Sequence, residues 1–422
     1  MLIAKAVWGA ICKMPKDPPV EFPNALRRRL GLPLLVLYGT GITIGAGIYV
    51  LIGAVAGHAG KYAPLSFLVA AIVMALTVAS YAELSTRFPV SAGEAAYVRA
   101  AFQSRVMSIF TGLLTVAIGV VASSAVTLGS AGYIGQLVDI PQSITVVIIA
   151  VALGSVSAWG IFESALLAGV FTLIEVGGLL AIIVAAIHAE VPVLAALIPP
   201  LPTDADTMSG IAFASLLAFF AFIGFEDLAN VVEEAKVPHR DIPRAMVLTL
   251  LISTILYVAV AAVAVSVVSV ERLSSSPAPL SIVFWEVAGV SPTTISVIAI
   301  VATLNTILAQ MTMAARVLYG MARQGDLPRA LGRVHSKTAT PLFATALIIL
   351  LVIAFALAVP LVRLAESTSL ATLVVFALVN LALLRLRKRG VQSQQPHVRV
   401  PTIIPAAGFT ACVVMIASAL LR

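Results

Sequence analysis

Long runs of apolar residues, separated by short polar stretches, make up most of this chain. Eleven runs stand out: residues 32–57, 63–84, 106–135, 143–160, 164–189, 209–232, 244–270, 291–320, 340–361, 365–386 and 402–421. A helix needs about 20 mostly apolar residues to cross the hydrocarbon core, which is about 30 Å thick. The runs are of this length and lack the alternation of β-strands in a barrel. The pattern therefore predicts an all-α polytopic membrane protein with eleven spans.

Two of the runs are interrupted near their middle. The first contains GTGITIGAGIYVLIG, with five glycines, and we expect its helix to break at Gly45-Ala46-Gly47. The sixth contains FASLLAFFAFIGFEDLANVV, which we expect to break near Gly224 and which places Glu226 in an apolar run. Since the two runs lie five helices apart, they cross the membrane in opposite directions. The pattern predicts two inverted five-helix repeats with a binding site at the midplane.

A break within a membrane span indicates which kind of ligand could bind there. Unwound backbone in lipid leaves N–H and C=O groups unpaired, and each costs several kcal/mol. The amides at the N-terminus of a half-helix favour a carboxylate, and the carbonyls at a C-terminus favour an ammonium. A zwitterionic amino acid satisfies both. Gly41 and Gly45 also form a small-xxx-small pattern that packs helices closely without a ligand. The matching break in the sixth run favours binding.

The composition agrees with a membrane protein and excludes several functions. Sixty per cent of the 422 residues are hydrophobic and 11% are charged, which is too little polar surface for a soluble protein. Cys12 and Cys412 lie far apart, and the five histidines do not cluster, so no disulfide framework, metal site or cofactor is expected.

Charge placement predicts the orientation. With the N-terminus in the cytoplasm, 22 of the 26 Lys and Arg residues fall on the cytoplasmic side. The net charge of +7 is therefore explained by loop topology and not by binding to nucleic acid. We expect a multi-pass protein of the cytoplasmic (inner) membrane. Its predicted units are a cytoplasmic N-terminal segment (1–31), a first repeat (32–189), a second repeat (209–388) and an additional transmembrane helix (401–421).

Several motifs resemble those of one transporter family. They are IGAGIYV, ELSTRFPVSAGEAAYV, FFAFIGFEDLANVVEEAKVPHRDIPRA, RVLYGMARQGDLP and VNLALLRLR, in that order. Together they resemble the amino acid–polyamine–organocation (APC) superfamily from about residue 30 to 405. The resemblance implies a leucine-transporter-type fold with a 5+5 inverted repeat. It also implies alternating access and a substrate held by discontinuous helices 1 and 6.

The resemblance also implies site residues. The backbone amides around Gly45, Ala46 and Gly47 would hold the substrate carboxylate. The carbonyls of Thr43, Phe220 and Ile223 would hold its amine, with Gly224 at the break. The Phe220 side chain lies where similar transporters place an aromatic gate.

The chain departs from the family pattern in two ways. Similar transporters usually have twelve helices, and eleven are predicted here. Several of them also place a lysine in the fifth helix, where its charge stands in for a sodium ion. This chain has Glu175 near that position. A carboxylate cannot replace a cation, so the coupling mechanism stays open.

Acidic residues inside the membrane are costly and usually mark function. Glu226 is a candidate for proton coupling or substrate contact, and it could also cap the half-helix that follows. Glu175 is a second proton-coupling candidate, and its alternative is a hydrogen-bonded helix contact. Asn305, Thr306 and Gln310 of the eighth run could face the substrate or simply pack helices.

Taken together, the sequence predicts a secondary transporter of an amino acid, driven by protons or by exchange. The expected partners are a small amino acid or amine, a proton and the lipid bilayer. The alternative within transport is a polyamine or organocation carrier, which would need more acid at the site. A membrane enzyme needs clustered His, Asp or Cys, and a channel needs a repeated filter or a charged ring, so both are disfavoured.

Overall fold

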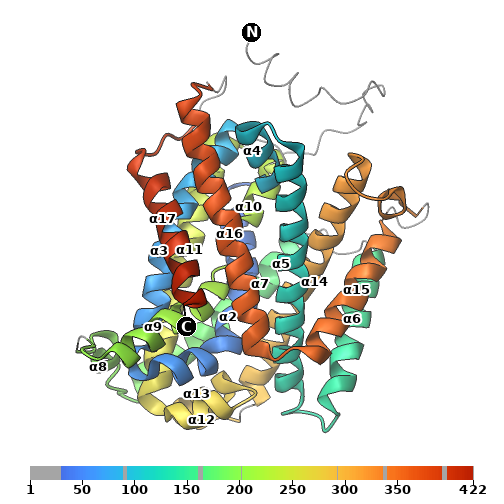
Figure 1. The fold of residues 1–422 in the computed structure, drawn as a ribbon. Coiled ribbons are helices and arrows are strands. Elements are labelled where there is room, and N and C mark those ends of the chain that lie inside the picture. The colour runs from blue at the N-terminus through green and yellow to red at the C-terminus, as the bar shows by residue number, and fades with distance from the viewer. Residues whose placement is uncertain are drawn as a thin grey trace.

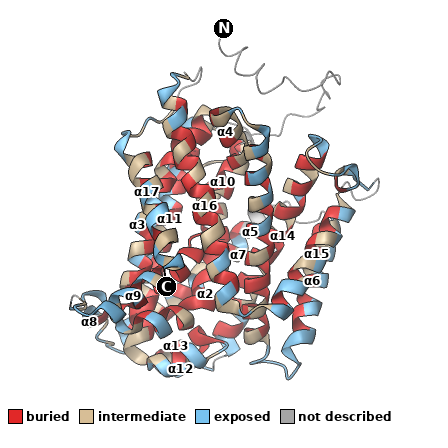
Figure 2. Cartoon of the chain, viewed as in Figure 1, coloured by how far each residue is buried: buried red, intermediate tan, exposed pale blue. Residues whose placement is uncertain are grey.

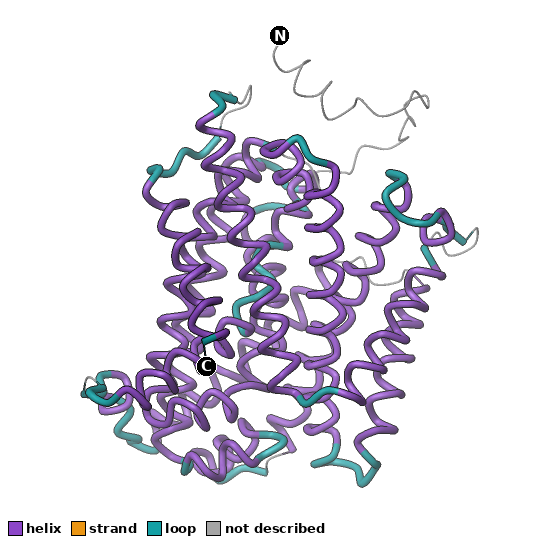
Figure 3. Tube along the Cα trace, viewed as in Figure 1, coloured by secondary structure: helices purple, strands orange, loops and turns teal. Residues whose placement is uncertain are grey.

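The structure is a computed structural model that describes residues 30–88, 93–159, 165–200, 202–291, 293–335, 340–391 and 397–421. The predicted N-terminal segment therefore falls almost entirely outside the described residues. Helices dominate these ranges (Figure 3), and Leu30 and Ala235 form an isolated β-bridge. Among the described residues, eight helical stretches are long and apolar enough to cross a membrane, and shorter apolar helices accompany them. The prediction of an all-α polytopic membrane protein is confirmed.

Each of the first five predicted spans contains a helix. These helices are α2 (Leu32–Ala59), α3 (Ala63–Arg87), α5 (Arg105–Ile134), α6 (Gln142–Trp159) and α7 (Ala165–His188). The sixth to tenth are α9 (Ala205–Phe220) with α10 (Asp227–Asn230), then α11 (Pro238–Val267), α14 (Thr293–Arg323), α15 (Leu342–Ala358) and α16 (Leu361–Lys388). The last is α17 (Ile403–Leu420).

Short helices cover the two ends of the bundle. At one end, here called the α4 end, lies α4 (Gly93–Phe102). At the other, the α13 end, lie α8 (Leu194–Leu197), α12 (Val270–Ser275) and α13 (Pro279–Ala288) (Figure 1). The described part of the chain also contains 3-10 turns at Gly60–Tyr62, Val232–Glu234 and Arg329–Gly332.

Several helices begin where the sequence supplies a cap or a proline. The side chain of Asp204 accepts a hydrogen bond from the amide of Thr207 at the start of α9 (2.7 Å). Ser104 caps α5 in the same way. In α3, α11 and α13 a proline occupies the first turn, where its missing N–H leaves no backbone bond unmade. These boundaries fix where each span enters the bundle.

The packing relates the first five spans to the next five. α2 packs on α9, α3 on α11, α5 on α14, and α6 on α15. Contacts between non-equivalent helices also come in pairs: α2 packs on α7 as α9 packs on α16, and α2 on α11 as α3 on α9. A two-fold relation between two five-helix units would produce this pattern. The buried residues lie along these central contacts, and exposed residues mark the outer helices (Figure 2).

The predicted break in the first span is wrong for this structure. Helix α2 is continuous from Leu32 to Ala59 and runs through residues 45–47. Its glycines allow close packing instead. A β-carbon at Gly45 would lie 2.0 Å from Oγ1 of Thr306, and one at Gly41 would lie 2.0 Å from Oγ1 of Thr172. Close contact with α14 and α7 therefore explains these glycines, and it offsets their cost of about 1 kcal/mol each in a helix.

Candidate functional site

The sixth span is interrupted, as predicted. Helix α9 ends at Phe220, residues 221–226 form turns, and α10 begins at Asp227. Gly224 has φ +128°, which side-chain-bearing residues rarely adopt, and a β-carbon there would lie 2.7 Å from Cγ2 of Ile42. The Gly224 amide donates to Oε2 of Glu226 (2.9 Å). Gly224 thus supplies both the turn and the room for α2.

Helix α2 touches this break directly. A β-carbon at Gly47 would lie 2.0 Å from the α-carbon of Ala221, the first residue after α9. The same stretch of α2 carries Thr43, which is buried and whose hydroxyl has no hydrogen-bond partner. The structure therefore brings the glycine-rich part of α2 against the break in the sixth span.

Tyr257 of α11 bridges the two elements. Its hydroxyl lies 2.7 Å from the carbonyl oxygen of Thr43 and 2.8 Å from that of Ala221. A phenol has one proton, so it can donate fully to only one of these acceptors at a time. A carbonyl of α2 and a carbonyl of the turn after α9 thus meet at one buried hydroxyl that has a single proton to donate. An ammonium group, with three N–H bonds, could donate to both.

No sequence motif pointed to Tyr257. It stands in the aliphatic stretch ISTILYVAVAAVA of the seventh span. A polar hydroxyl there must find a buried partner, and that was the available signal. Its ring packs 5.0 Å from that of Phe222 and 5.7 Å from that of Phe67, centroid to centroid. These contacts hold the hydroxyl at the break.

Several of the predicted backbone ligands already take part in hydrogen bonds. The Thr43 carbonyl accepts from Tyr257, and the Phe220 carbonyl accepts from the amide of Ile223 (3.2 Å). Gly45, Ala46 and Gly47 lie within continuous helix, where amides bond to the preceding turn. Phe220 and Ile223 are buried beside the break. The predicted ligands of α2 and of the sixth span therefore lie side by side.

Glu175 and Asn305 lie together, between α7 and α14. Nδ2 of Asn305 donates to Oε1 of Glu175 (3.1 Å), while the buried Oε2 has no partner. The hydroxyl of Tyr49 in α2 donates to the Glu175 carbonyl (2.6 Å), and that of Tyr133 donates to the Tyr49 carbonyl (2.6 Å). A polar chain thus joins the second half of α2 to α5 and α7.

The predicted Gln310 is not part of this chain of contacts. Its side chain is 3% exposed, and its Oε1 has no partner. The Gln310 carbonyl lies near Gly119 of α5. Nothing in these contacts connects Gln310 with the break.

Three acids gather on the α4 side of the break: Asp227 and Glu94, which are buried, and Glu226, which is partly buried. The hydroxyl of Tyr81 donates to Oε1 of Glu94 (3.0 Å), and Nδ2 of Asn230 donates to Oδ1 of Asp227 (3.2 Å). Glu94 lies on α4, outside the spans, and burial raises its pKa while the Tyr81 bond partly lowers it. The motif SAGEAAYV gives no sign that Glu94 is buried, so Glu94 was not predicted as a site residue.

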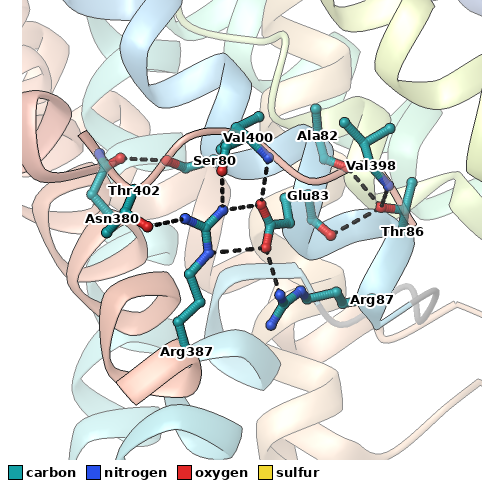
Figure 4. Close-up of polar contacts among 10 residues, drawn as sticks. All are labelled: Ser80, Ala82, Glu83, Thr86, Arg87, Asn380, Arg387, Val398, Val400 and Thr402. Carbon is teal, nitrogen blue, oxygen red and sulfur yellow. Dashed lines mark hydrogen bonds and ion pairs between the residues drawn. The ribbon is translucent and has the colours of Figure 1, made fainter. Parts of the chain in front are cut away.

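A second polar cluster fixes the α4 end of α3 (Figure 4). The carboxylate of Glu83 is fully buried and contacts the guanidinium groups of Arg387 and Arg87. It also accepts from the amide of Val400 (2.9 Å), and Arg387 donates to Thr402 (3.1 Å). The cluster ties α3 to α16 and to the segment before α17.

A cavity of about 490 Å³ lies at the α13 end. Val50 of α2 forms part of its wall, three residues beyond Gly47, and Gln142, Ser143 and Ser276 supply polar side chains. The other lining residues come from α5, α6, Pro277 and the junction of α15 with α16. No described residue of α9 or α10 lines the cavity, so it is separate from the break.

Comparison with known proteins gives a consistent result. Residues 30–421 match the family model described as "Amino acid permease". An uncharacterised transporter of Mycobacterium tuberculosis (strain ATCC 25618 / H37Rv) is 33% identical over 406 residues, covering 96% of this chain and 88% of that protein.

Two further relatives carry substrate names. The branched-chain amino acid permease BcaP of Bacillus subtilis (strain 168) is 30% identical over 394 residues, covering 87% of this chain and 82% of that protein. The vacuolar cationic amino acid transporter 2 of Arabidopsis thaliana is 29% identical over 420 residues, covering 90% of this chain and 64% of that protein.

Proposed function

The chain belongs to the amino acid permease family, and we propose that it is a secondary transporter that carries an amino acid across the membrane by alternating access. The observation that carries the proposal is the meeting of the Thr43 and Ala221 carbonyls at the interrupted sixth span. Two acceptors that share one Tyr257 proton are suited to an ammonium group. In this proposal the substrate's amine replaces the Tyr257 hydroxyl.

The substrate carboxylate requires a second set of donors. We assign it to the amides of Gly45, Ala46 and Gly47, which become available when α2 opens there. Weak helix propensity at the glycines makes opening least costly at this point. Tyr257 and Tyr133 bind α2 carbonyls on either side of it, at Thr43 and Tyr49. The described structure, with α2 continuous, then corresponds to the closed state.

The surroundings of the break favour an apolar amino acid. Phe220, Ile223 and Ile42 line it, and the nearby carboxylate of Glu226 is already bonded to the Gly224 amide. A polyamine would need several free acids to replace the water around its charges. The polyamine alternative is therefore not favoured.

For coupling, we propose that protons act through Glu175 and Glu226. An ionised carboxylate with one buried, unpaired oxygen costs more to bury than a neutral acid. Glu175 therefore carries a proton in the closed state and loses it when α7 and α14 rearrange. Glu226 adjoins the break, so its charge state would follow the opening of that region. The position of Asn305 as a hydrogen-bond donor to Glu175 makes it a supporting residue.

We further propose that the protein lies in the cytoplasmic (inner) membrane with its N-terminus in the cytoplasm. The bias of Lys and Arg supports this orientation, in which the α4 end faces the cytoplasm. The two five-helix units are residues 32–189 and 209–388, followed by the helix at 401–421. The paired packing of equivalent helices supports this division.

Uptake of labelled amino acids by purified protein in liposomes tests the function. We expect uptake of an apolar amino acid that increases when the α4 side is less acidic than the opposite side. Glu175→Gln and Glu226→Gln should each weaken the response to the pH gradient. If neither variant changes it, both proton roles are wrong; if no amino acid enters, the transport proposal fails.

A further inference from the structure

Helix α4 places a buried acid against the half-helix that follows the break. Its first residue, Gly93, has φ +47°, and a β-carbon there would lie 2.7 Å from Oδ1 of Asn230 on α10. Glu94 follows in the first turn and is 6% exposed. The close approach of Gly93 therefore seats Glu94 where α4 meets α10, between the break and the aqueous phase.

We propose that Glu94 is a proton-carrying residue of the transport cycle, which releases its proton to the aqueous phase at the α4 end when α4 separates from α10. This inference rests on the proposed proton-coupled transport and adds a residue to it.

The charges around Glu94 support this role. Glu226 and Asp227 lie within electrostatic reach of Glu94. None of the three takes part in an ion pair within the described part of the chain. Like charges in a buried site disfavour joint ionisation, so such acids share protons. Breaking the contact between α4 and α10 separates Glu94 from the other two.

The aromatic and cationic groups around α4 indicate which end of this helix can move away from α10. Tyr81 donates to Glu94, and the ring of Tyr97 lies between those of Tyr81 and Phe88, with centroids 6.3 Å from each. The cationic groups lie at the other end of α4: Arg389 donates to the Ala101 carbonyl (3.1 Å), and Arg385 stacks on Phe102. These contacts hold the C-terminal end of α4 against α16. The N-terminal end of α4, which carries Glu94, is therefore the end that can move away from α10.

Burial is the main effect that favours the protonated form of Glu94. The buried environment raises the pKa of Glu94, and contact with water removes that effect. Separation of α4 from α10 therefore lowers the proton affinity of Glu94, and closing restores it. One proton per cycle could leave at this end together with the substrate.

The test is amino acid accumulation by the full chain in liposomes, with one pH unit across the membrane and the α4 side alkaline. One coupled proton supports up to about tenfold accumulation. We expect Glu94→Gln to abolish accumulation driven by the gradient but to retain exchange of labelled for unlabelled amino acid. Glu94→Asp should keep part of the accumulation. Glu366→Gln, at an exposed ion pair with Arg363, is the matched control and should behave as wild type.

Tyr81→Phe gives a second readout. Removal of the donor should raise the pKa of Glu94 and move the pH profile of accumulation to higher pH, which a purely structural role would not do. Gradient-driven accumulation by Glu94→Gln equal to wild type would overturn the inference alone. Loss of exchange in Glu94→Gln would overturn it by assigning Glu94 a structural role. Wild-type uptake that ignores the gradient would overturn it together with the proposed proton coupling.

Discussion

A β-carbon at Gly47 would lie 2.0 Å from the α-carbon of Ala221, so α2 and the end of α9 meet backbone to backbone. The contact joins the glycine-rich part of the first span to the interruption in the sixth. At this contact the carbonyls of Thr43 in α2 and of Ala221 after α9 both lie within hydrogen-bond distance of the Tyr257 hydroxyl. Both the packing of the closed state and the proposed binding site depend on this contact.

Gly47→Ala should abolish amino acid uptake in liposomes. Its methyl group cannot fit 2.0 Å from a backbone atom, so α2 must move away from the break. Overpacking of this kind costs about 1–3 kcal/mol, and Gly47→Leu should be more severe. The matched control is Gly177→Ala in α7, where nothing lies within 4 Å of the added β-carbon. Normal uptake by a correctly inserted Gly47→Leu variant would refute the assignment of the site.

Tyr257→Phe should lower the KM for uptake. In the empty state the Thr43 and Ala221 carbonyls lose their donor, at a cost of about 1–2 kcal/mol that substrate binding restores. We expect a KM about 5- to 30-fold lower than wild type, together with a lower Tm. Tyr133→Phe removes a similar bond to α2 at Tyr49 and should lower the Tm with an unchanged KM. A higher KM in Tyr257→Phe would mean that the hydroxyl binds substrate directly.

Glu83→Gln should destabilise the protein strongly. The change leaves Arg387 and Arg87 without their buried carboxylate, and breaking a buried pair in this way costs about 3–5 kcal/mol. Thermal unfolding in detergent should show a clear fall in Tm. Glu366→Gln removes an ion pair whose Arg363 side chain is 72% exposed, so its effect should be below about 1 kcal/mol. Equal effects of the two variants would contradict the importance of the cluster in Figure 4.

Glu94 should make the stability of the protein depend on pH. Because burial raises the pKa of Glu94, the folded state binds its proton more tightly than the unfolded state. This contribution is fully present below the ordinary glutamate pKa of about 4.5 and is lost as the pH rises through the folded-state pKa. The Tm of wild type should therefore fall with rising pH relative to that of Glu94→Gln. Parallel Tm curves for the two proteins would show that Glu94 is not protonated when folded.

The sequence was informative where hydrophobic pattern decides the structure. Each predicted apolar run contains a helix. The turn at Gly224 could be predicted because glycine weakens a helix and because the two acids that follow it are costly in an apolar span. The state of Gly45 and Gly47 could not be predicted in the same way. Low helix propensity permits the helix to unwind at these glycines. Whether α2 is continuous there depends on its contacts with Thr306 and Ala221, which are far away in the sequence. Local patterns do not reveal such partners.

The polar contacts of the site were also out of reach. Tyr257 donates a hydrogen bond to the carbonyl of Thr43, which is 214 positions away in the sequence, and Glu94 accepts one from Tyr81, which is 13 positions away. Only the fold brings the members of each pair together. Asn305 and Glu175 were both candidates from the sequence, because polar groups within apolar spans must find partners, but the sequence did not predict that they pair with each other.

Competition of substrate analogues for uptake tests the central claim most directly. If backbone carbonyls hold the ammonium and amides hold the carboxylate, removal of either group leaves buried partners unpaired. An amine without the carboxylate and an acid without the amine should each compete roughly 10- to 100-fold more weakly than the intact amino acid. An amine that competes as well as the amino acid would contradict the account, because the amides of α2 would then contribute nothing to binding.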